Sequence, residues 1–172
     1  MSLLNPIKQD LFRLCWLIDE LDDSTYIQSL PLISGATIGQ HVRHMLEFYG
    51  CILLDMKAGL ICYDNRKRDL RIETERTVAF ATVEKLVETL EEILIDKKVC
   101  VQANYSSQDQ YDIFLNSTLF RELAYALDHS IHHQAIVKAG LATMPEVLEK
   151  ISELGVAPST VRYRLSVNKT IL

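Results

Sequence analysis

The stretch GQHVRHMLE (residues 39–47) and the stretch DHSIHHQ (residues 128–134) decide how this chain is expected to fold. Together they contain all five histidines of the sequence. Histidines three or four residues apart lie on one side of an α-helix, and neutral imidazole is the most common side-chain ligand for metals. Two such groups, about eighty residues apart, therefore indicate two helices that bring imidazoles together around a metal ion.

The residues around these stretches predict further helices. Pro6 suits the first position of a helix, and Thr37 with Gln40 suits the capping box of a second one. Gly59 is a natural end for that second helix. Asn116 or Ser117 is expected to cap the last long helix, which ends before Gly140. We therefore expect four long amphipathic helices, over residues 5–21, 37–58, about 77 or 82 to 96, and 117–139.

The segment between the third and fourth helices has a different pattern. Residues 98–106 and 111–115 alternate loosely between apolar and polar side chains, which predicts a hairpin that turns at residues 107–109. Residues 145–154 predict a short helix, followed by an irregular tail. The expected fold is all-α, a single four-helix bundle over residues 1–172 with a possible small hairpin before its last helix. Such bundles build metal sites in their cores.

Composition narrows the class of protein. The chain has 172 residues, of which 48% are hydrophobic and 24% charged, as is usual for a single globular domain. Its net charge of −5 gives no electrostatic reason to expect nucleic acid or an anionic membrane as a partner. No apolar stretch is long enough for a membrane span, and no secretory signal is visible. We expect a cytoplasmic protein with four reduced cysteines.

The histidines differ in how well they can share an ion. His129 and His133 are four residues apart and project to one side, whereas His132 points about 100° away from His133. His41 or His44 then supplies the third ligand. Three imidazoles leave a coordination position open for water or substrate, and they suit zinc, nickel, copper or iron. Ser130 after His129 excludes the His-Glu-x-x-His pattern of zinc peptidases.

These stretches resemble the DinB family, also called DinB/YfiT-like metalloenzymes. The resemblance lies in IGQHVRH (38–44), REL (121–123) and HSIHHQA (129–135), and it extends over about residues 5–140. It implies a four-helix bundle, often a homodimer, that holds zinc or nickel on His44, His129 and His133. Many family members have Arg-Gly-Gln after the last histidine, whereas this chain has QAI (134–136). That departure affects what the resemblance implies about the substrate, not about the metal.

The resemblance also implies a reaction class. Characterised relatives include thiol-dependent transferases and isomerases, so the expected substrate is a small molecule, with a low-molecular-weight thiol as a candidate. We expect a metal-dependent thiol S-transferase or hydrolase, in which the ion activates a water or thiol. His41, His132 or Glu47 would move protons. The basic residues 66–68 would contact an anionic substrate or form a solvated loop.

Two other functions remain open at this point. The first alternative applies if no substrate reaches the ion. The protein would then be a non-catalytic helical dimer, either metal-binding or structural, that is involved in the stress response. Residues 146–165 look like part of a helix-turn-helix. DNA binding is disfavoured because no third helix completes such a domain and acidic residues nearly balance the basic ones.

Overall fold

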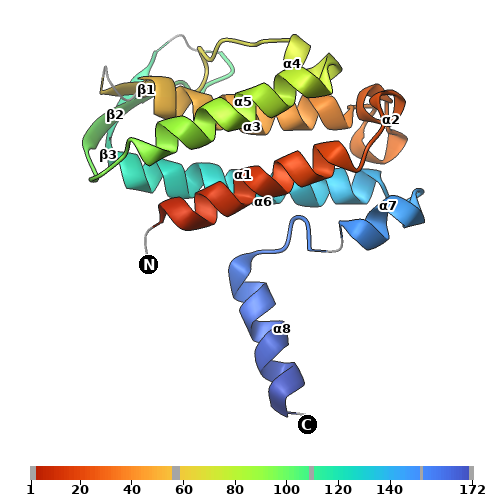
Figure 1. The fold of residues 1–172 in the computed structure, drawn as a ribbon. Helices are drawn as coiled ribbons and strands as arrows, with labels where there is room; N and C mark the ends of the chain where they lie inside the picture. Colours follow the sequence, from red (N-terminus) through yellow and green to blue (C-terminus); the bar gives the residue numbers. More distant parts are fainter. Residues whose placement is uncertain (1–2, 56–58, 109–110, 152, 171–172) are drawn as a thin grey trace.

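The computed structural model describes residues 3–55, 59–108, 111–151 and 153–170 (Figure 1). Its long helices are α1 (Leu4–Asp19), α3 (Ile38–Asp55), α5 (Arg76–Glu91) and α6 (Leu119–Gly140). Helix α3 packs against both α5 and α6, and α1 packs against the same two helices. Buried aliphatic side chains such as Leu11, Met45, Leu86 and Leu123 fill the space between them. None of the helices in these ranges is long and apolar enough to cross a membrane.

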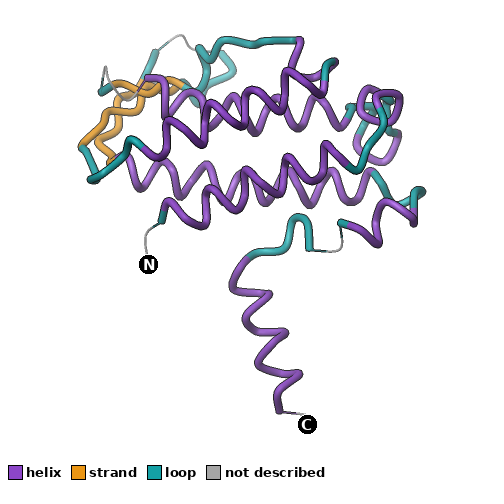
Figure 2. Tube along the Cα trace, in the orientation of Figure 1, coloured by secondary structure: helices purple, strands orange, loops and turns teal. Residues whose placement is uncertain are grey.

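A three-stranded mixed sheet lies at one end of the long helices (Figure 2). Strand β2 (Lys98–Ala103) is central, and it pairs in parallel with β1 (Leu60–Cys62) and antiparallel with β3 (Ile113–Thr118). The expected all-α four-helix class is therefore wrong, because the chain combines helices with a sheet. Strands β2 and β3 lie where the hairpin was expected, but β1 was missed because three residues are too few to show alternation.

The cap and the C-terminal segment also differ from the expectation. Strand β3 runs through residues 116 and 117, so α6 is capped by Thr118, whose Oγ1 accepts from the Arg121 N–H at 3.3 Å. The tail after α7 (Pro145–Lys150) is not irregular but forms α8 (Pro158–Thr170). Short helices α2 (Asp23–Ile27), η1 (Pro31–Ile33) and α4 (Arg71–Thr74) complete the fold. The expected helix end at 56–58 and the middle of the hairpin turn, at 109, lie outside the described residues.

The capping box expected before the second long helix is present. The Thr37 N–H donates to Gln40 Oε1 at 3.1 Å, and the Gln40 N–H donates to Thr37 Oγ1 at 3.0 Å. Each side chain thus satisfies a backbone donor that the first turn of a helix leaves without a partner. This reciprocal pair fixes where α3 begins and therefore how far along the helix His41 and His44 lie.

A buried polar network joins α6 to the rest of the core. The Asp10 carboxylate accepts from Tyr49 Oη at 2.9 Å and from Gln134 Nε2 at 2.7 Å. Burial raises the pKa of Asp10. Gln134 Oε1 in turn accepts from the Gly155 N–H at 3.3 Å. Gln134 directly follows His133, so this network fixes the rotation of α6 at the predicted metal ligands.

Candidate metal centre

Two helices supply the residues around the histidine cluster. Helix α3 provides His41, His44 and Phe48, and α6 provides His129 and His133. The spacings of three, four and seven residues place each set on one helix face. Because α3 and α6 pack against each other, the two faces meet. His44 Nε2 lies 2.8 Å from His129 Nε2, and His41 Nδ1 lies 2.9 Å from His133 Nδ1.

Three of the histidines are arranged as ligands for one ion. His44, His129 and His133 each offer a ring nitrogen, and these nitrogens all lie within 4.8 Å of one another. Zinc–nitrogen bonds of 2.0–2.1 Å place tetrahedral ligand nitrogens about 3.3 Å apart. The Nε2 atoms of His44 and His129 would therefore separate slightly to admit an ion. The structure thus brings together His129 and His133, which the helical spacing paired, and His44, which the resemblance implied as the ligand from the first group.

The protonation state of the cluster suits metal binding. Burial, together with the neighbouring His129, lowers the pKa of His44 to about 4. Burial and the neighbouring His44 lower the pKa of His133 to about 3, and burial lowers the pKa of His129 as well. A neutral imidazole carries the lone pair that a metal needs. At neutral pH all three rings are therefore ready to act as ligands.

A pH dependence follows from these shifts. Protons and metal compete for the same ring nitrogens, so a lowered pKa moves that competition to lower pH. We expect the zinc affinity, measured by calorimetry, to fall less steeply below about pH 6.5 than that of a site with three ordinary imidazoles, because His44 and His133 take up protons only near pH 4 and 3. The metal-free protein should lose stability as the pH falls from about 6.5 through 4, because the unfolded chain takes up protons that the folded cluster excludes. A steep loss of zinc affinity between about pH 7 and 6 would contradict the lowered pKa values.

The three residues expected to move protons lie in different environments. His41 contacts His133 directly, with their Nδ1 atoms 2.9 Å apart. His132 is exposed, and only the edge of its ring approaches His133, with the ring centroids 5.5 Å apart. Glu47 is buried and accepts from the Asp69 N–H at 2.9 Å and from Arg66 Nε at 3.3 Å. Glu47 thus holds the loop after β1, and all three proton-transfer roles remain predictions.

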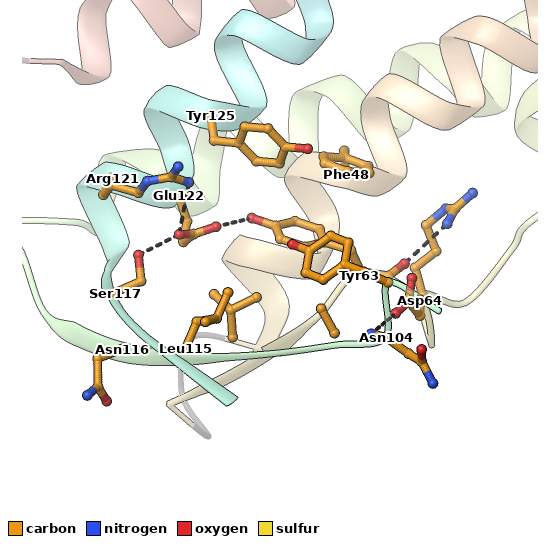
Figure 3. A pocket seen from close by; sticks show the side chains of 14 residues that line it. Phe48, Tyr63, Asp64, Asn104, Leu115, Asn116, Ser117, Arg121, Glu122 and Tyr125 are labelled. Carbon is orange, nitrogen blue, oxygen red and sulfur yellow. Dashed lines mark hydrogen bonds and ion pairs between the residues drawn. The ribbon is translucent and has the colours of Figure 1, made fainter. Parts of the chain in front are cut away.

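A cavity of about 520 Å³ lies next to aromatic residues that contact the cluster, although no histidine of the described ranges lines it (Figure 3). Phe48 and Tyr125 line it and also contact the His129 ring, with ring centroids 4.2 Å and 5.9 Å from it. Tyr63 stacks on Phe48 at 4.5 Å with an angle of 13° between the ring planes. These three aromatic residues all line the cavity, and two of them, Phe48 and Tyr125, also contact the predicted metal ligand His129.

Glu122 holds the Tyr63 ring in its position at the cavity. Its carboxylate is 3% exposed and accepts from Tyr63 Oη at 2.6 Å and from Ser117 Oγ (Figure 3). The bond to Glu122 and burial raise the pKa of Tyr63 above its usual range, with burial the larger cause. Arg121 Nη1 adds a contact to Glu122 at 3.3 Å. Glu122 therefore joins β3, the loop after β1 and α6 at the cavity.

Sequence reasoning missed most of the cavity wall. Phe48 follows His44 by four residues, and Tyr125 precedes His129 by four, so the helical spacing alone places each beside a ligand. Arg66 was treated as part of a basic loop. Its side chain is only 16% exposed, and it contacts Glu47 and His44, whereas Lys67 and Arg68 are exposed. No short-range signal predicts which residue of a charged loop turns inward.

Comparisons with known proteins add one relative. No protein-family model matches the chain, and no solved structure matches it. FK506-binding protein 5 of Rhizopus delemar is 33% identical over 104 residues, which make up 59% of this chain and 26% of that protein. The chain therefore matches about a quarter of the length of this relative. A match of this extent does not show a family for the chain.

Proposed function

We propose that the protein is a metal-dependent enzyme of the DinB-like kind, with a divalent ion held by His44, His129 and His133. The observation that carries this proposal is the convergence of three imidazoles from two helices, close to a cavity of about 520 Å³ whose lining includes Phe48 and Tyr125, both neighbours of His129. Cavities of roughly 300–1,000 Å³ accept small-molecule ligands. Zinc or nickel suits a ligand set of three nitrogens. The relative from Rhizopus delemar contributes no residue role to this proposal.

The chemistry follows from the open coordination position. When bound, the ion lowers the pKa of a water or thiol and supplies a nucleophile near neutral pH. His41 orients the His133 ring through the contact between their Nδ1 atoms, as outer partners of metal ligands commonly do. Phe48 and Tyr125 line the cavity, so their rings would contact a substrate bound there. This arrangement supports a thiol S-transferase or a hydrolase acting on a small molecule.

The substrate is expected to carry a negative charge near Arg121. This guanidinium lines the cavity, its side chain is 64% exposed, and its carbon Cζ lies 5.4 Å from the centre of the Tyr125 ring. A planar guanidinium binds a carboxylate with two parallel hydrogen bonds. A low-molecular-weight thiol with a carboxylate would thus have one group for the ion and another for Arg121.

The alternative is a protein that holds a metal without catalysis. That function requires a fourth protein ligand to close the coordination sphere. His41 touches His133, but it is not among the residues whose ligand atoms all lie within 4.8 Å of one another. We therefore favour an open position and a catalytic ion.

The homodimer remains a proposal as well. Helix α8 stands away from the helical body (Figure 1), and it exposes Tyr163, Leu165 and Val167. An isolated helix of this length is only marginally stable in water, so packing against a second copy would stabilise it.

The enzymatic proposal is tested by removing the metal and restoring it. We expect the chelated protein to lose turnover, because the nucleophile forms on the ion. Zinc or nickel should restore it and magnesium should not, since magnesium prefers oxygen ligands. The assays are transfer of mercaptoacetate, a small thiol with a carboxylate, to 1-chloro-2,4-dinitrobenzene with release of chloride, and hydrolysis of p-nitrophenyl acetate. Stoichiometric zinc binding without turnover in either assay would favour the non-catalytic alternative.

A further inference from the structure

Strand β3 is an edge of the sheet, and no described strand pairs with its outer side (Figure 1). In an antiparallel ladder, the backbone N–H and C=O groups of successive residues point alternately to the two sides of the strand. The Leu119 N–H donates to the Lys97 backbone oxygen at 2.7 Å, so every second residue before Leu119, as far back as Ile113, points toward β2. Phe114 and Asn116 therefore point outward. Within the described residues, no backbone hydrogen bond reaches their N–H and C=O groups.

The edge at β3 lacks the features that usually prevent strand pairing. Folded proteins protect sheet edges with very short strands, charged residues, prolines or bulges. Strand β1, the opposite edge, has only three residues, whereas β3 has six. Residues 113–118 include no charged residue and no proline, and they pair with β2 without a bulge. Apolar side chains are exposed on both faces of β3, Ile113 by 45%, Phe114 by 63% and Leu115 by 43%. The edge therefore suits a further extended strand.

Strand β3 is complementary to itself when two copies run antiparallel about a two-fold axis. The ladder continues only if the residues that point outward face one another. An axis at Leu115 meets this condition, because Phe114 of each copy then lies opposite Asn116 of the other. This register also overlaps all of residues 112–118, which an axis at any other position would not do. The backbone alone thus favours a second copy with Leu115 at the centre.

Charges at the two ends of this overlap are complementary as well. The register places Asp112 of one copy opposite Thr118 of the other, and Thr118 is the N-cap of α6. A carboxylate is favourable at the N-terminus of a helix. The first turn of α6 also carries the exposed, cationic Arg121. Because the axis repeats this arrangement, each copy brings one carboxylate to the start of α6 in the other.

We propose that β3 pairs with β3 of a second copy of this chain, antiparallel about a two-fold axis at Leu115, to form one continuous six-stranded sheet. This inference rests on the proposed homodimer, but neither on α8 nor on a metal. Leu115 and Ser117 line the cavity of about 520 Å³. Ile113 of the second copy lies opposite Ser117 and on the same face of the sheet. Each copy therefore adds an apolar side chain to the rim of the cavity in the other.

Sedimentation velocity of the full chain over a range of concentrations measures this dimer. Asn116→Pro removes a backbone N–H that points outward, and proline is tolerated at such positions of an edge strand. We expect the parent chain to dimerise and this variant to dimerise at least about tenfold more weakly, because the two-fold axis removes two hydrogen bonds at once. Circular dichroism should show that the variant stays folded. Phe114→Lys should also weaken the dimer, since lysine on an edge strand opposes pairing.

A control variant on α8 separates this interface from the other exposed apolar surface. Tyr163→Glu/Leu165→Glu changes two exposed side chains of α8, which lies away from β3 (Figure 1). We expect this variant to dimerise as the parent does. A dimer that is lost in this variant and kept in Asn116→Pro would leave the homodimer standing but overturn its formation through β3.

Disulfide cross-linking tests the register, because residue 115 meets its own copy only if the axis lies there. Opposite residues of such a pair have Cα atoms about 4.5 Å apart, which a disulfide can span. We expect Leu115→Cys to form a covalent dimer on mild oxidation, above the background that the four native cysteines give in the parent. Ile113→Cys alone should not, since the two copies of residue 113 would lie about 13 Å apart. A mixture of Ile113→Cys with Ser117→Cys should cross-link.

The outcomes separate this proposal from the proposed homodimer. A parent chain that stays monomeric would overturn both. The pairing of β3 is overturned if Asn116→Pro stays folded and dimerises as the parent does, or if Ile113→Cys cross-links as readily as Leu115→Cys. Should Asn116→Pro unfold, the cross-linking of Leu115→Cys decides. Loss of metal binding or of turnover bears on the metal site and leaves the β3 interface standing.

Discussion

His44→Ala is expected to abolish stoichiometric binding of zinc or nickel. The substitution removes one of the three imidazoles whose nitrogens lie within 4.8 Å of one another. Loss of an outer-shell partner lowers metal affinity by roughly 10–100-fold, so loss of a direct ligand should cost more. We expect the same result for His129→Ala and His133→Ala. Elemental analysis of protein purified without an affinity tag, followed by zinc titration, measures the effect.

Two other histidines serve as graded controls for this prediction. His132→Ala removes an exposed ring that lies outside the cluster, so it should keep the full metal content. His41→Ala removes the contact to His133 Nδ1 and should lower the affinity by roughly 10–100-fold without abolishing binding. If His132→Ala lost the metal and His44→Ala kept it, the assignment of ligands would be wrong.

Gly39→Ala is expected to destabilise the fold by about 3 kcal/mol or more, because its Cβ has no room. That atom would lie 2.1 Å from the backbone oxygen of Glu73 and 2.9 Å from a ring carbon of Tyr26. Neither neighbour can withdraw easily, since Tyr26 Oη donates to the Ile72 backbone oxygen at 2.7 Å and so joins α2 to α4. The close approach of α3 to α4 therefore requires glycine at position 39. Urea unfolding followed by circular dichroism measures the free energy of unfolding.

The same substitution at Gly50 provides the matched control, because both glycines lie in α3. A Cβ at Gly50 would meet no atom within 4 Å. Alanine loses less conformational entropy than glycine on entering a helix, so Gly50→Ala should stabilise the protein by about 0.5–1 kcal/mol. Equal effects at the two positions would mean that α3 does not pack closely on α4.

The sequence predicted the parts of the fold that local chemistry controls. The capping box of Thr37 and Gln40 and the apolar faces of the long helices depend on residues three or four apart, which a sequence shows directly. The pair His129 and His133 was predicted for the same reason, because helical spacing places both on one face, whereas spacing left His41 and His44 as alternatives and only the resemblance implied His44. The structure then brings His44 to that face through the packing of α3 on α6.

The features that were missed depend on contacts between distant segments. Strand β1 exists because Leu60 to Cys62 pair in parallel with β2, forty residues later in the chain, and so short a strand has no pattern of its own. The link from Glu122 to Tyr63 and the inward turn of Arg66 are side-chain choices that only the assembled fold determines. Helix α8 was taken for an irregular tail because its apolar residues Val161, Tyr163, Leu165 and Val167 recur at every second position, which is not the spacing of one helix face.

X-ray absorption spectroscopy of the zinc-loaded protein tests the central claim, that one divalent ion is held by His44, His129 and His133. The predicted spectrum has three imidazole nitrogens at about 2.0–2.1 Å and at least one further ligand that is not imidazole. In His44→Ala the same measurement should find no zinc bound at one equivalent. A spectrum with fewer than three imidazoles, or one that His44→Ala leaves unchanged, would contradict the claim.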